Sequence, residues 1–137
     1  MEKVTLKSTI LRPADKVWEY FTKPEHITQW NFASPDWACP KAEADLREGG
    51  RFNYRMEAKD GSFGFDFTGT FNEIVPSQKL TYTIDDGRMV EVLFNAVDNS
   101  TTEIIETFEA ETMNPVEMQR EGWSNILHNF EKYAENN

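Results

Sequence analysis

The sequence contains a single cysteine, no long apolar run and no signal segment. Because Cys39 has no possible partner within the chain, an intrachain disulfide is excluded and a reducing compartment fits best. No apolar stretch approaches the roughly 20 residues that a membrane helix needs. The N-terminus also lacks the apolar segment of a secretory signal. These absences predict a cytoplasmic protein that does not enter a membrane.

Positive charge is scarce. Lys and Arg total 14 against 24 Asp and Glu, which gives a formal net charge of −10. Nucleic acid is therefore not an expected partner, because its binding relies on clustered Lys and Arg. An anionic membrane surface is disfavoured for the same reason. Arg47 and Arg51 are expected to pair with nearby carboxylates such as Asp45 or Glu48, and gripping an anionic ligand is the alternative.

The motifs of common metal and cofactor sites are also missing. The two histidines, His26 and His128, lie far apart in the sequence, and no HExxH pattern accompanies them, so we expect no metal site. No GxGxxG, Walker or GxSxG pattern occurs. Gly49-Gly50 precedes a predicted strand rather than a helix, which excludes a phosphate-binding loop. We predict no cofactor. His26 is expected at the surface, and His128 in solvent or, alternatively, at the edge of a pocket.

The strand and helix patterns that are present fit one domain. The 137 residues are expected to form a single domain over residues 1–137 with a sizeable core. The expected elements are a strand over residues 4–11, a helix beginning at Pro13, a short helix from Pro24 to about Trp30, an irregular stretch over 31–40, about six strands over 41–111, and a helix from Pro115 to Tyr133 or Ala134. Short turns between consecutive strands predict an antiparallel meander. The predicted fold class is α+β, with a curved antiparallel sheet of about six to seven strands around the long last helix.

The last helix is amphipathic. Its apolar residues recur at helical spacing and form one stripe of Trp123, Ile126, Leu127, Phe130, Tyr133 and Ala134. Gly122 interrupts the helix at a cost of about 1 kcal/mol relative to Ala. We expect Gly122 to pack closely against a sheet residue, and clearance at the mouth of a cavity is the alternative.

Residues 49–71 predict a hairpin with a defined register. Asp60-Gly61 is typical of a two-residue loop, which sets Lys59 opposite Ser62. The opposed pairs are then Tyr54–Phe67, Met56–Phe65, Ala58–Phe63, Phe52–Gly69, Phe71–Gly50 and, on the other face, Arg55–Asp66. This register puts every large ring on one face, with a glycine opposite each ring at the base.

The rings of this chain exceed what one helix stripe can cover. Aromatic residues make up 13% of the sequence, and rings line cavities better than they fill a flat core. We predict a partly open pocket, although any one ring can instead belong to the core. The candidate ligand-binding residues are Trp18, Trp30, Trp37, Phe52, Tyr54, Met56, Phe65, Phe67, Tyr82, Phe94, Glu106, Phe108, Trp123, Leu127 and Phe130.

Glu106 is the most interesting polar candidate. If Ile104 and Phe108 face inward, strand alternation turns Glu106 inward as well, and its pKa rises in an aromatic pocket. It would then be a candidate general acid or ligand anchor. In the other phase Ile105 is inside and Glu106 lies in water, and the pattern leaves both phases open.

Four segments together resemble one known family. They are Pro13-Ala14-Asp15-Lys16-Val17-Trp18 with Pro24-Glu25-His26-Ile27-Thr28-Gln29-Trp30; Ala44-Asp45-Leu46-Arg47-Glu48-Gly49-Gly50-Arg51-Phe52; Phe67-Thr68-Gly69-Thr70-Phe71-Asn72-Glu73-Ile74 with Pro76 and Lys79-Leu80; and Gly122-Trp123. In this order and spacing they are similar to the family named after the activator of heat-shock-protein-90 ATPase. That family lies in the START-like (SRPBCC) superfamily of helix-grip folds, with the birch-pollen allergen and the polyketide cyclases.

The resemblance implies a cavity between a curved sheet and a long C-terminal helix. The leading functional hypothesis is binding of a hydrophobic small molecule, aromatic or lipid-like. The first alternative is a cyclase- or dehydratase-type enzyme using a buried Glu or Tyr. The second is a module that binds a chaperone partner, although we expect no counterpart of the separate N-terminal domain of the eukaryotic co-chaperone. Both a monomer and a homodimer fit the sequence.

Overall fold

Seven antiparallel strands form one sheet in the computed structural model, which describes residues 2–137. The described elements are β1 (Lys3–Ile10), α1 (Ala14–Thr22), α2 (Pro24–Ile27), β2 (Trp37–Ala44), β3 (Arg51–Ala58), β4 (Gly64–Val75), β5 (Lys79–Ile84), β6 (Met89–Asp98), β7 (Thr101–Glu109) and α3 (Val116–Glu135). The predicted fold class is therefore confirmed, with two short helices after the first strand and one long helix at the end.

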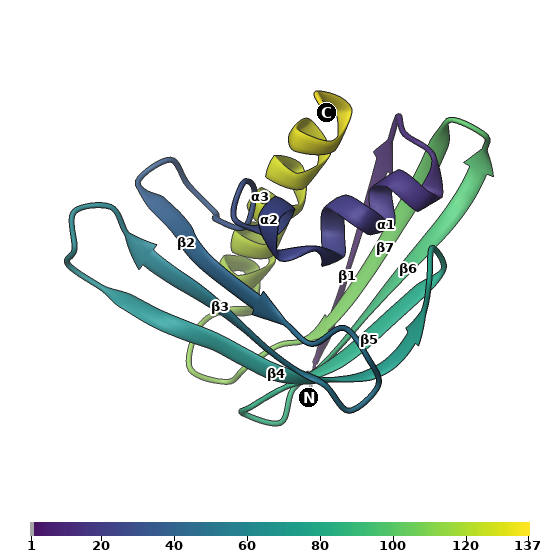
Figure 1. The fold of residues 1–137 in the computed structure, drawn as a ribbon. Coiled ribbons are helices and arrows are strands. Elements are labelled where there is room, and N and C mark those ends of the chain that lie inside the picture. The colour runs from purple at the N-terminus through teal and green to yellow at the C-terminus, as the bar shows by residue number, and fades with distance from the viewer. Residues whose placement is uncertain (1) are drawn as a thin grey trace.

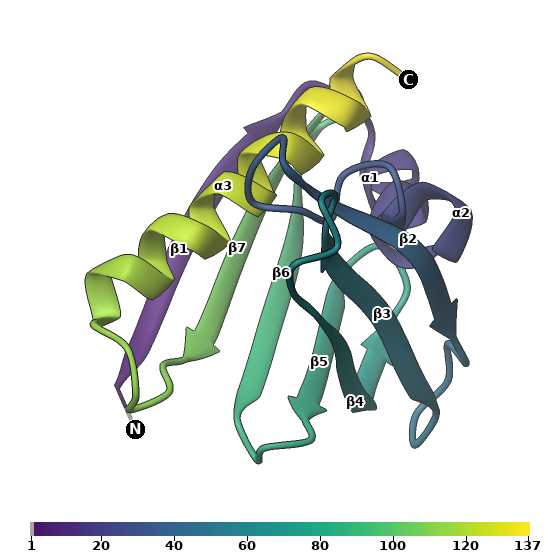
Figure 2. The same ribbon diagram turned by 90° about the vertical axis from the view of Figure 1, so that its left-hand side faces the viewer.

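The sheet is a meander that is extended at one edge by its first strand. β2 to β7 pair in chain order, and β1 pairs with β7. The sheet bends strongly, so that β2, β3 and β4 rise on one side and β1, β6 and β7 on the other (Figure 1). α3 runs obliquely along β1 and β7 (Figure 2). α1 packs against β6 and α2 against β2, so the two short helices bridge the two sides.

Strand alternation divides β7 into two faces. Thr102, Ile104, Glu106 and Phe108 are buried, and the residues between them are only half-buried. The phase with Glu106 inside is thus the one that forms. The stripe of α3 packs over this face: Leu127, Phe130 and Ala134 are buried, and Trp123, Ile126 and Tyr133 are packed partly against the core. The amphipathic pattern of the last helix is confirmed.

The β3–β4 hairpin has the predicted register but a different loop. The opposed pairs Phe52–Gly69, Tyr54–Phe67, Arg55–Asp66 and Met56–Phe65 all form. However, the Gly61 N–H donates to the Ala58 carbonyl (3.0 Å) and Ala58 N–H to Phe63 (2.9 Å), so the loop has four residues, Lys59 to Ser62. The backbone N–H of Lys59 instead donates to the backbone carbonyl of Asp36 (2.8 Å). The register is unchanged because the loop is longer by one residue on each side: Lys59 and Ser62, which were expected to pair across the turn, belong to the loop.

Other boundaries and pairings also differ from expectation. The stretch 31–40 was predicted to be irregular, but β2 already begins at Trp37, because its backbone pairs with Ala58 of β3. α2 ends at Ile27 rather than near Trp30, and turns continue to that residue. Arg47 pairs with Asp45 as expected (2.7 Å), whereas Arg51 forms a two-pronged pair with Asp85 of the β5–β6 turn.

The expected close packing of Gly122 is wrong. A Cβ atom at this position would find no other atom within 4 Å, apart from its chain neighbours and the backbone of its own helix. The position faces open space although the residue is half-buried. No sheet atom approaches the Cβ position of residue 122, so sterics do not require glycine there.

Candidate ligand-binding cavity

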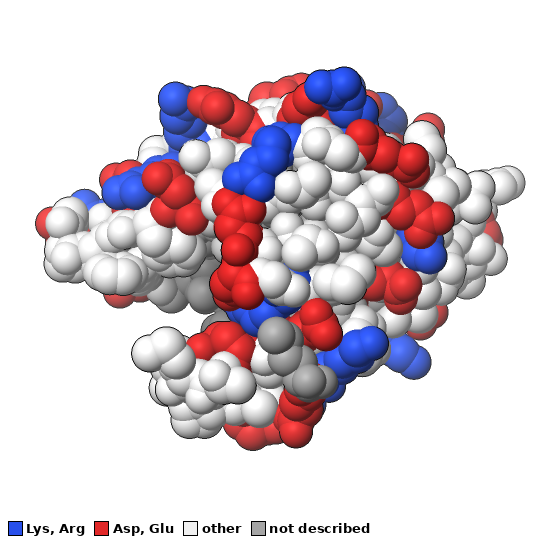
Figure 3. All heavy atoms as spheres, turned by 90° about the horizontal axis from the view of Figure 1, so that it is seen from below, with Lys and Arg blue, Asp and Glu red and all other residues white. Residues whose placement is uncertain are grey.

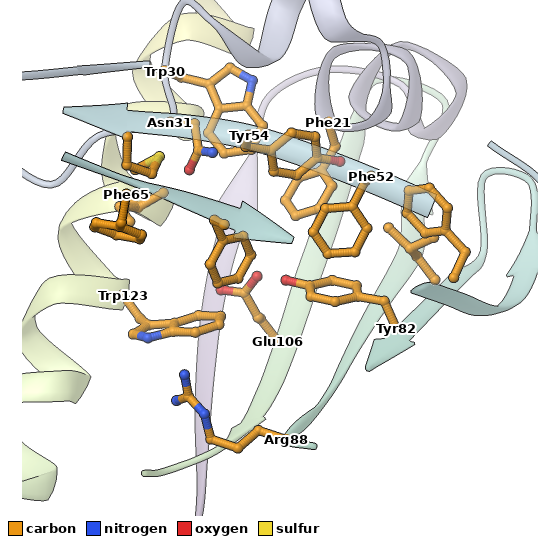
Figure 4. Close-up of a pocket in the computed structure, with 15 residues that line it drawn as sticks. Phe21, Trp30, Asn31, Phe52, Tyr54, Phe65, Tyr82, Arg88, Glu106 and Trp123 are labelled. Atoms are coloured by element: carbon orange, nitrogen blue, oxygen red, sulfur yellow. The ribbon is translucent and has the colours of Figure 1, made fainter. Parts of the chain in front are cut away.

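A cavity of about 270 Å³ lies among the sheet, α3 and the segment that follows α2. Its volume lies just below the range of roughly 300–1,000 Å³ that is typical of ligand pockets. The lining consists of Phe21, Trp30, Asn31, Phe52, Tyr54, Met56, Phe65, Phe67, Phe71, Leu80, Tyr82, Arg88, Glu106, Trp123 and Ile126. Figure 4 shows these side chains converging from strands, helices and the loop after α2.

Stacked rings build the floor and one wall. The Phe52 ring stacks on Tyr54 (4.9 Å between centroids) and meets Tyr82 edge-on at 5.2 Å. These contacts follow from the register, which brings alternate residues of β3, β4 and β5 to one face. The wall is therefore a continuous aromatic surface, suited to flat apolar groups.

Trp123 forms the opposite wall on α3. Its indole stacks on the ring of Phe108, with centroids 4.1 Å apart and planes 10° apart. Phe67 approaches the same indole edge-on at 6.4 Å. Phe108 is fully buried and does not line the cavity. It acts behind Trp123 and fixes the orientation of the indole.

Glu106 is the acidic residue of the lining. The side chain is 6% exposed, and burial alone raises its pKa from 4.5 to about 7. No residue within 2–137 hydrogen-bonds to the carboxyl or forms an ion pair with it, yet its oxygens keep contact with the cavity. A buried carboxyl without a protein partner is unusual, because buried polar groups are normally satisfied.

Two phenols share the cavity with Glu106. Burial raises the pKa of both Tyr54 and Tyr82, so both hydroxyls are protonated over the physiological range. The Tyr82 hydroxyl points toward the Glu106 carboxyl (Figure 4), and the nearby carboxylate further raises the pKa of Tyr82. Neither hydroxyl has a hydrogen-bond partner among the described residues, although both remain accessible from the cavity. The two groups can donate to, or accept from, a bound molecule.

Arg88 reaches the lining from the β5–β6 turn. Its guanidinium donates to an Asp86 carboxylate oxygen (2.8 Å) and to the Glu109 carbonyl (3.4 Å). The positive charge is therefore already compensated by its own neighbours. No sequence pattern marked Arg88 or Asn31 as lining residues, since both lie outside the regular elements.

The structure brings together part of the predicted set. Of the candidate residues, Trp30, Phe52, Tyr54, Met56, Phe65, Phe67, Tyr82, Glu106 and Trp123 line the cavity. Lining residues that the sequence reasoning missed are Phe21, Asn31, Phe71, Leu80, Arg88 and Ile126. Two of these six residues carried a signal in the sequence: Phe71 lies opposite Gly50 in the predicted hairpin register, and Ile126 belongs to the apolar stripe of the last helix.

The remaining candidates lie elsewhere. Trp18 meets Phe94 edge-on at 5.1 Å, and this pair packs between α1 and β6. Phe130 is fully buried between Trp30 and Phe21, and Leu127 is buried in the core. Phe108 supports Trp123 from behind. Neighbouring side chains cover these residues completely or in part, so they do not line the cavity.

Trp37 does not line the cavity and lies at the start of β2, the edge strand next to β3. It clusters with Phe63 and Phe65, with centroids 6.0 and 6.2 Å away. Phe63 is 62% exposed and Phe65 42% exposed. Since Phe65 also lines the cavity, the three rings form an exposed apolar rim beside it.

The histidines lie away from the cavity. His26 was expected at the surface, but it is half-buried, with Nδ1 2.6 Å from the Tyr133 hydroxyl. His128 is exposed and lies 3.7 Å from Glu131. Among residues 2–137, no group of three or more potential metal-binding side chains occurs, and no helix is long and apolar enough to span a membrane.

Surface charge is mixed rather than segregated on the face seen in Figure 3. Acidic and basic side chains lie interspersed there. Elsewhere in the described residues, oppositely charged side chains also pair within 4 Å, as Lys79–Glu73 and Arg51–Asp85 do. No broad basic area is visible in this view. This agrees with the deficit of Lys and Arg in the sequence.

Solved structures with more than 40% sequence identity share this fold over nearly the whole chain. A solution NMR structure of an AHSA1-like protein from Aeromonas hydrophila is 41% identical, covers 98% of this chain and 93% of its own, and superimposes with a TM-score of 0.92. The solution structure of a Cytophaga hutchinsonii protein is 43% identical, covers 98% and 92% of the two chains, and has a TM-score of 0.84. A Nitrosomonas europaea crystal structure, at 20% identity and a TM-score of 0.83, shares the fold.

The search of curated proteins found no match. The model of the Activator of Hsp90 ATPase homolog 1-like protein family matches residues 12–135, nearly the whole chain. The predicted resemblance is thus confirmed, and this chain belongs to the Activator of Hsp90 ATPase homolog 1-like family of START-like, helix-grip domains.

Proposed function

We propose that the protein binds a small hydrophobic ligand, aromatic or lipid-like, in the cavity between the sheet and α3. The supporting observation is an aromatic cavity that contains hydrogen-bonding groups without protein partners. Tyr54, Tyr82 and Glu106 each remain accessible from the cavity and unpaired with any described residue. In a purely structural core, such buried polar groups normally have hydrogen-bond partners, or apolar side chains stand in their place.

The direct test is to look for the ligand. Native mass spectrometry of freshly purified protein should reveal a co-purified small molecule, and thermal-shift screening with flat aromatic and fatty compounds should raise the melting temperature. Ile126→Trp inserts a large ring into the cavity and should abolish the shift. Asn125→Trp is the matched control, because Asn125 is exposed on the same helix. Failure of every compound to stabilise the wild-type protein would overturn the proposal.

A second candidate is catalysis of the cyclase or dehydratase type. It is favoured by one observation, the orientation of the Tyr82 hydroxyl toward a carboxyl whose pKa is about 7 (Figure 4). In a dehydration, ionised Glu106 would take a proton from carbon and return it to the departing hydroxyl, so that water leaves. Tyr82 would hydrogen-bond the departing oxygen. An activity that is unchanged in Glu106→Gln would eliminate this role.

A third candidate is a chaperone-binding module. The exposed rim of Trp37, Phe63 and Phe65 is the feature that favours it, since apolar patches of this kind mark interaction sites. The family name refers to activation of an Hsp90 ATPase. Stimulation of a purified Hsp90 ATPase by the wild-type protein, lost in Phe63→Ser, would support this role. Absence of stimulation would exclude it.

A further inference from the structure

Glu106 stands alone as an acidic group in the cavity lining. Within the described residues, its neighbours on the adjacent strands are apolar, because Leu6 of β1 and Val92 of β6 lie opposite it in the two ladders. The other titratable groups that line the cavity are Tyr54, Tyr82 and Arg88. None of them forms a hydrogen bond or ion pair with the carboxyl within 2–137. The carboxyl therefore lacks a counter-ion of its own.

The rings around Glu106 favour a cation over an anion. Trp123 and Tyr82 lie on either side of the carboxyl in Figure 4, and Tyr54 and Phe52 continue the aromatic wall. Ring faces carry negative electrostatic potential and attract ammonium groups, most strongly where water is excluded. A carboxylate within an aromatic enclosure combines two attractions for the same positive charge.

The rest of the electrostatics points the same way. Arg88 is the cation of the lining, and its charge is already shared between Asp86 and the Glu109 carbonyl. Its charge is therefore partly neutralised, which makes Arg88 a weaker anchor for an anionic ligand than an unpaired guanidinium would be. The formal net charge of −10 also raises the local concentration of cations and repels anions.

We propose that the ligand of this cavity is a small hydrophobic amine, whose ammonium group pairs with Glu106 while its apolar part packs against the rings. The inference rests on the proposed ligand-binding function and specifies the chemical class of the ligand. The Tyr82 hydroxyl, directed toward the same carboxyl, accepts a second ammonium hydrogen. A volume of about 270 Å³ limits the apolar part to about two rings or a short chain.

Protonation controls this pairing. The ammonium binds the ionised carboxylate, so binding below the carboxyl pKa of about 7 must expel the Glu106 proton. Amine affinity is therefore expected to fall as the pH decreases from 8 to 5. A neutral ligand of the same shape has no such requirement, so its affinity stays nearly constant.

Three probes with one skeleton test the inference: naphthylmethylamine, naphthylmethanol and naphthoate, measured by calorimetry at pH 8. The wild-type protein should bind the amine about 10-fold or more tightly than the alcohol, because a hydrogen bond to a charged group exceeds a neutral one by this order. Glu106→Gln should remove that preference and leave the alcohol affinity within about twofold. Glu103→Gln is the matched control, since it removes the same charge from the outer face of β7.

Each outcome separates the two proposals. Equal binding of amine and alcohol, or an amine preference that persists in Glu106→Gln, overturns the amine inference and leaves the cavity function standing. Tightest binding of the carboxylate overturns it as well. If none of the three binds, the amine inference and the proposed function for ligands of this size fail together. Should Glu106→Gln not fold, the amine-to-alcohol ratio of the wild-type protein and its pH dependence still decide the question.

Discussion

The ring of Phe52 occupies the space that a Cβ atom would need at Gly69, its partner across the β3–β4 ladder. Such an atom would lie 2.6 Å from Cζ of Phe52 and 2.5 Å from the Thr83 carbonyl oxygen. The ring therefore rests directly on the glycine backbone, and from there it reaches the cavity and stacks on Tyr54. One missing methyl group thus sets the position of a cavity wall.

Gly69→Ala should destabilise the protein and displace the Phe52 ring. The Thr83 carbonyl belongs to a strand and cannot rotate away, so we expect a loss of about 1–3 kcal/mol in the free energy of unfolding. Chemical denaturation monitored by circular dichroism gives this value. An unchanged denaturation midpoint would show that the sheet relaxes around the added methyl group.

Gly122→Ala should have the opposite effect. The position is within α3 and faces open space, so Ala adds no clash and improves helix propensity. We expect the free energy of unfolding to rise by about 0.5–1 kcal/mol. A destabilised variant would mean that the helix surface at this turn is covered in solution. Gly122 can instead provide clearance at the mouth of the cavity. In that case the large side chain of Gly122→Leu should weaken ligand binding, whereas the single methyl group of Gly122→Ala should not.

Stability should decrease as the pH rises through the titration range of Glu106. The carboxyl pKa is about 7 in the folded protein against 4.5 for the ordinary value, so the folded state binds more protons between these limits. The free energy of unfolding therefore falls by about 3 kcal/mol from pH 4.5 to pH 7 and levels off above. Denaturation at pH 5, 6, 7 and 8 measures this slope.

Glu106→Gln should flatten that profile. The amide does not titrate, so the variant should be nearly as stable at pH 8 as at pH 5, whereas Glu103→Gln should keep the wild-type slope. The Asp85 carboxyl has a pKa lowered to about 2 by Arg51 and Thr68, and its effect lies below this window. A wild-type profile without a decline over pH 5–8 would contradict the burial of an unpaired Glu106.

Cys39 should resist thiol reagents in the folded protein. The thiol is 2% exposed, and burial raises its pKa to about 11, so little reactive thiolate exists at pH 8. We expect labelling by a maleimide to be slow in buffer and fast in denaturant, which mass spectrometry resolves. Rapid labelling under native conditions would indicate that the β2 edge opens frequently.

The sequence alone predicted the architecture and the hairpin register. Tyr54, Phe67 and their neighbours alternate along two strands, and only one pairing puts all of the rings on one face with glycines opposite the base. Local pattern was sufficient because register is strongly specified when one face is buried. The loop was predicted less well, since its four residues depend on the contact of Lys59 with Asp36, a residue distant in sequence.

The cavity depends on which rings are covered by other rings. Phe108 and Phe130 share inward faces with lining residues, but Trp123 and Trp30 lie over them. Alternation predicts the direction of a side chain, and it contains no information about the neighbour that lies on top. Arg88 is the opposite case, because a turn brings it to the cavity without any periodic signal.

The sequence by itself determined the single sheet, the apolar stripe of α3, the ring-bearing hairpin and the family, because these follow from local periodicity and residue spacing. Tertiary structure alone decided the phase of β7, and with it the position of Glu106, since alternation allowed either Glu106 or Ile105 inside. The ladders with β1 and β6 resolve that choice by aligning the strand's inward residues with the concave face. The curvature of the sheet leaves a cavity in front of the Glu106 carboxyl. No described side chain hydrogen-bonds to the carboxyl there.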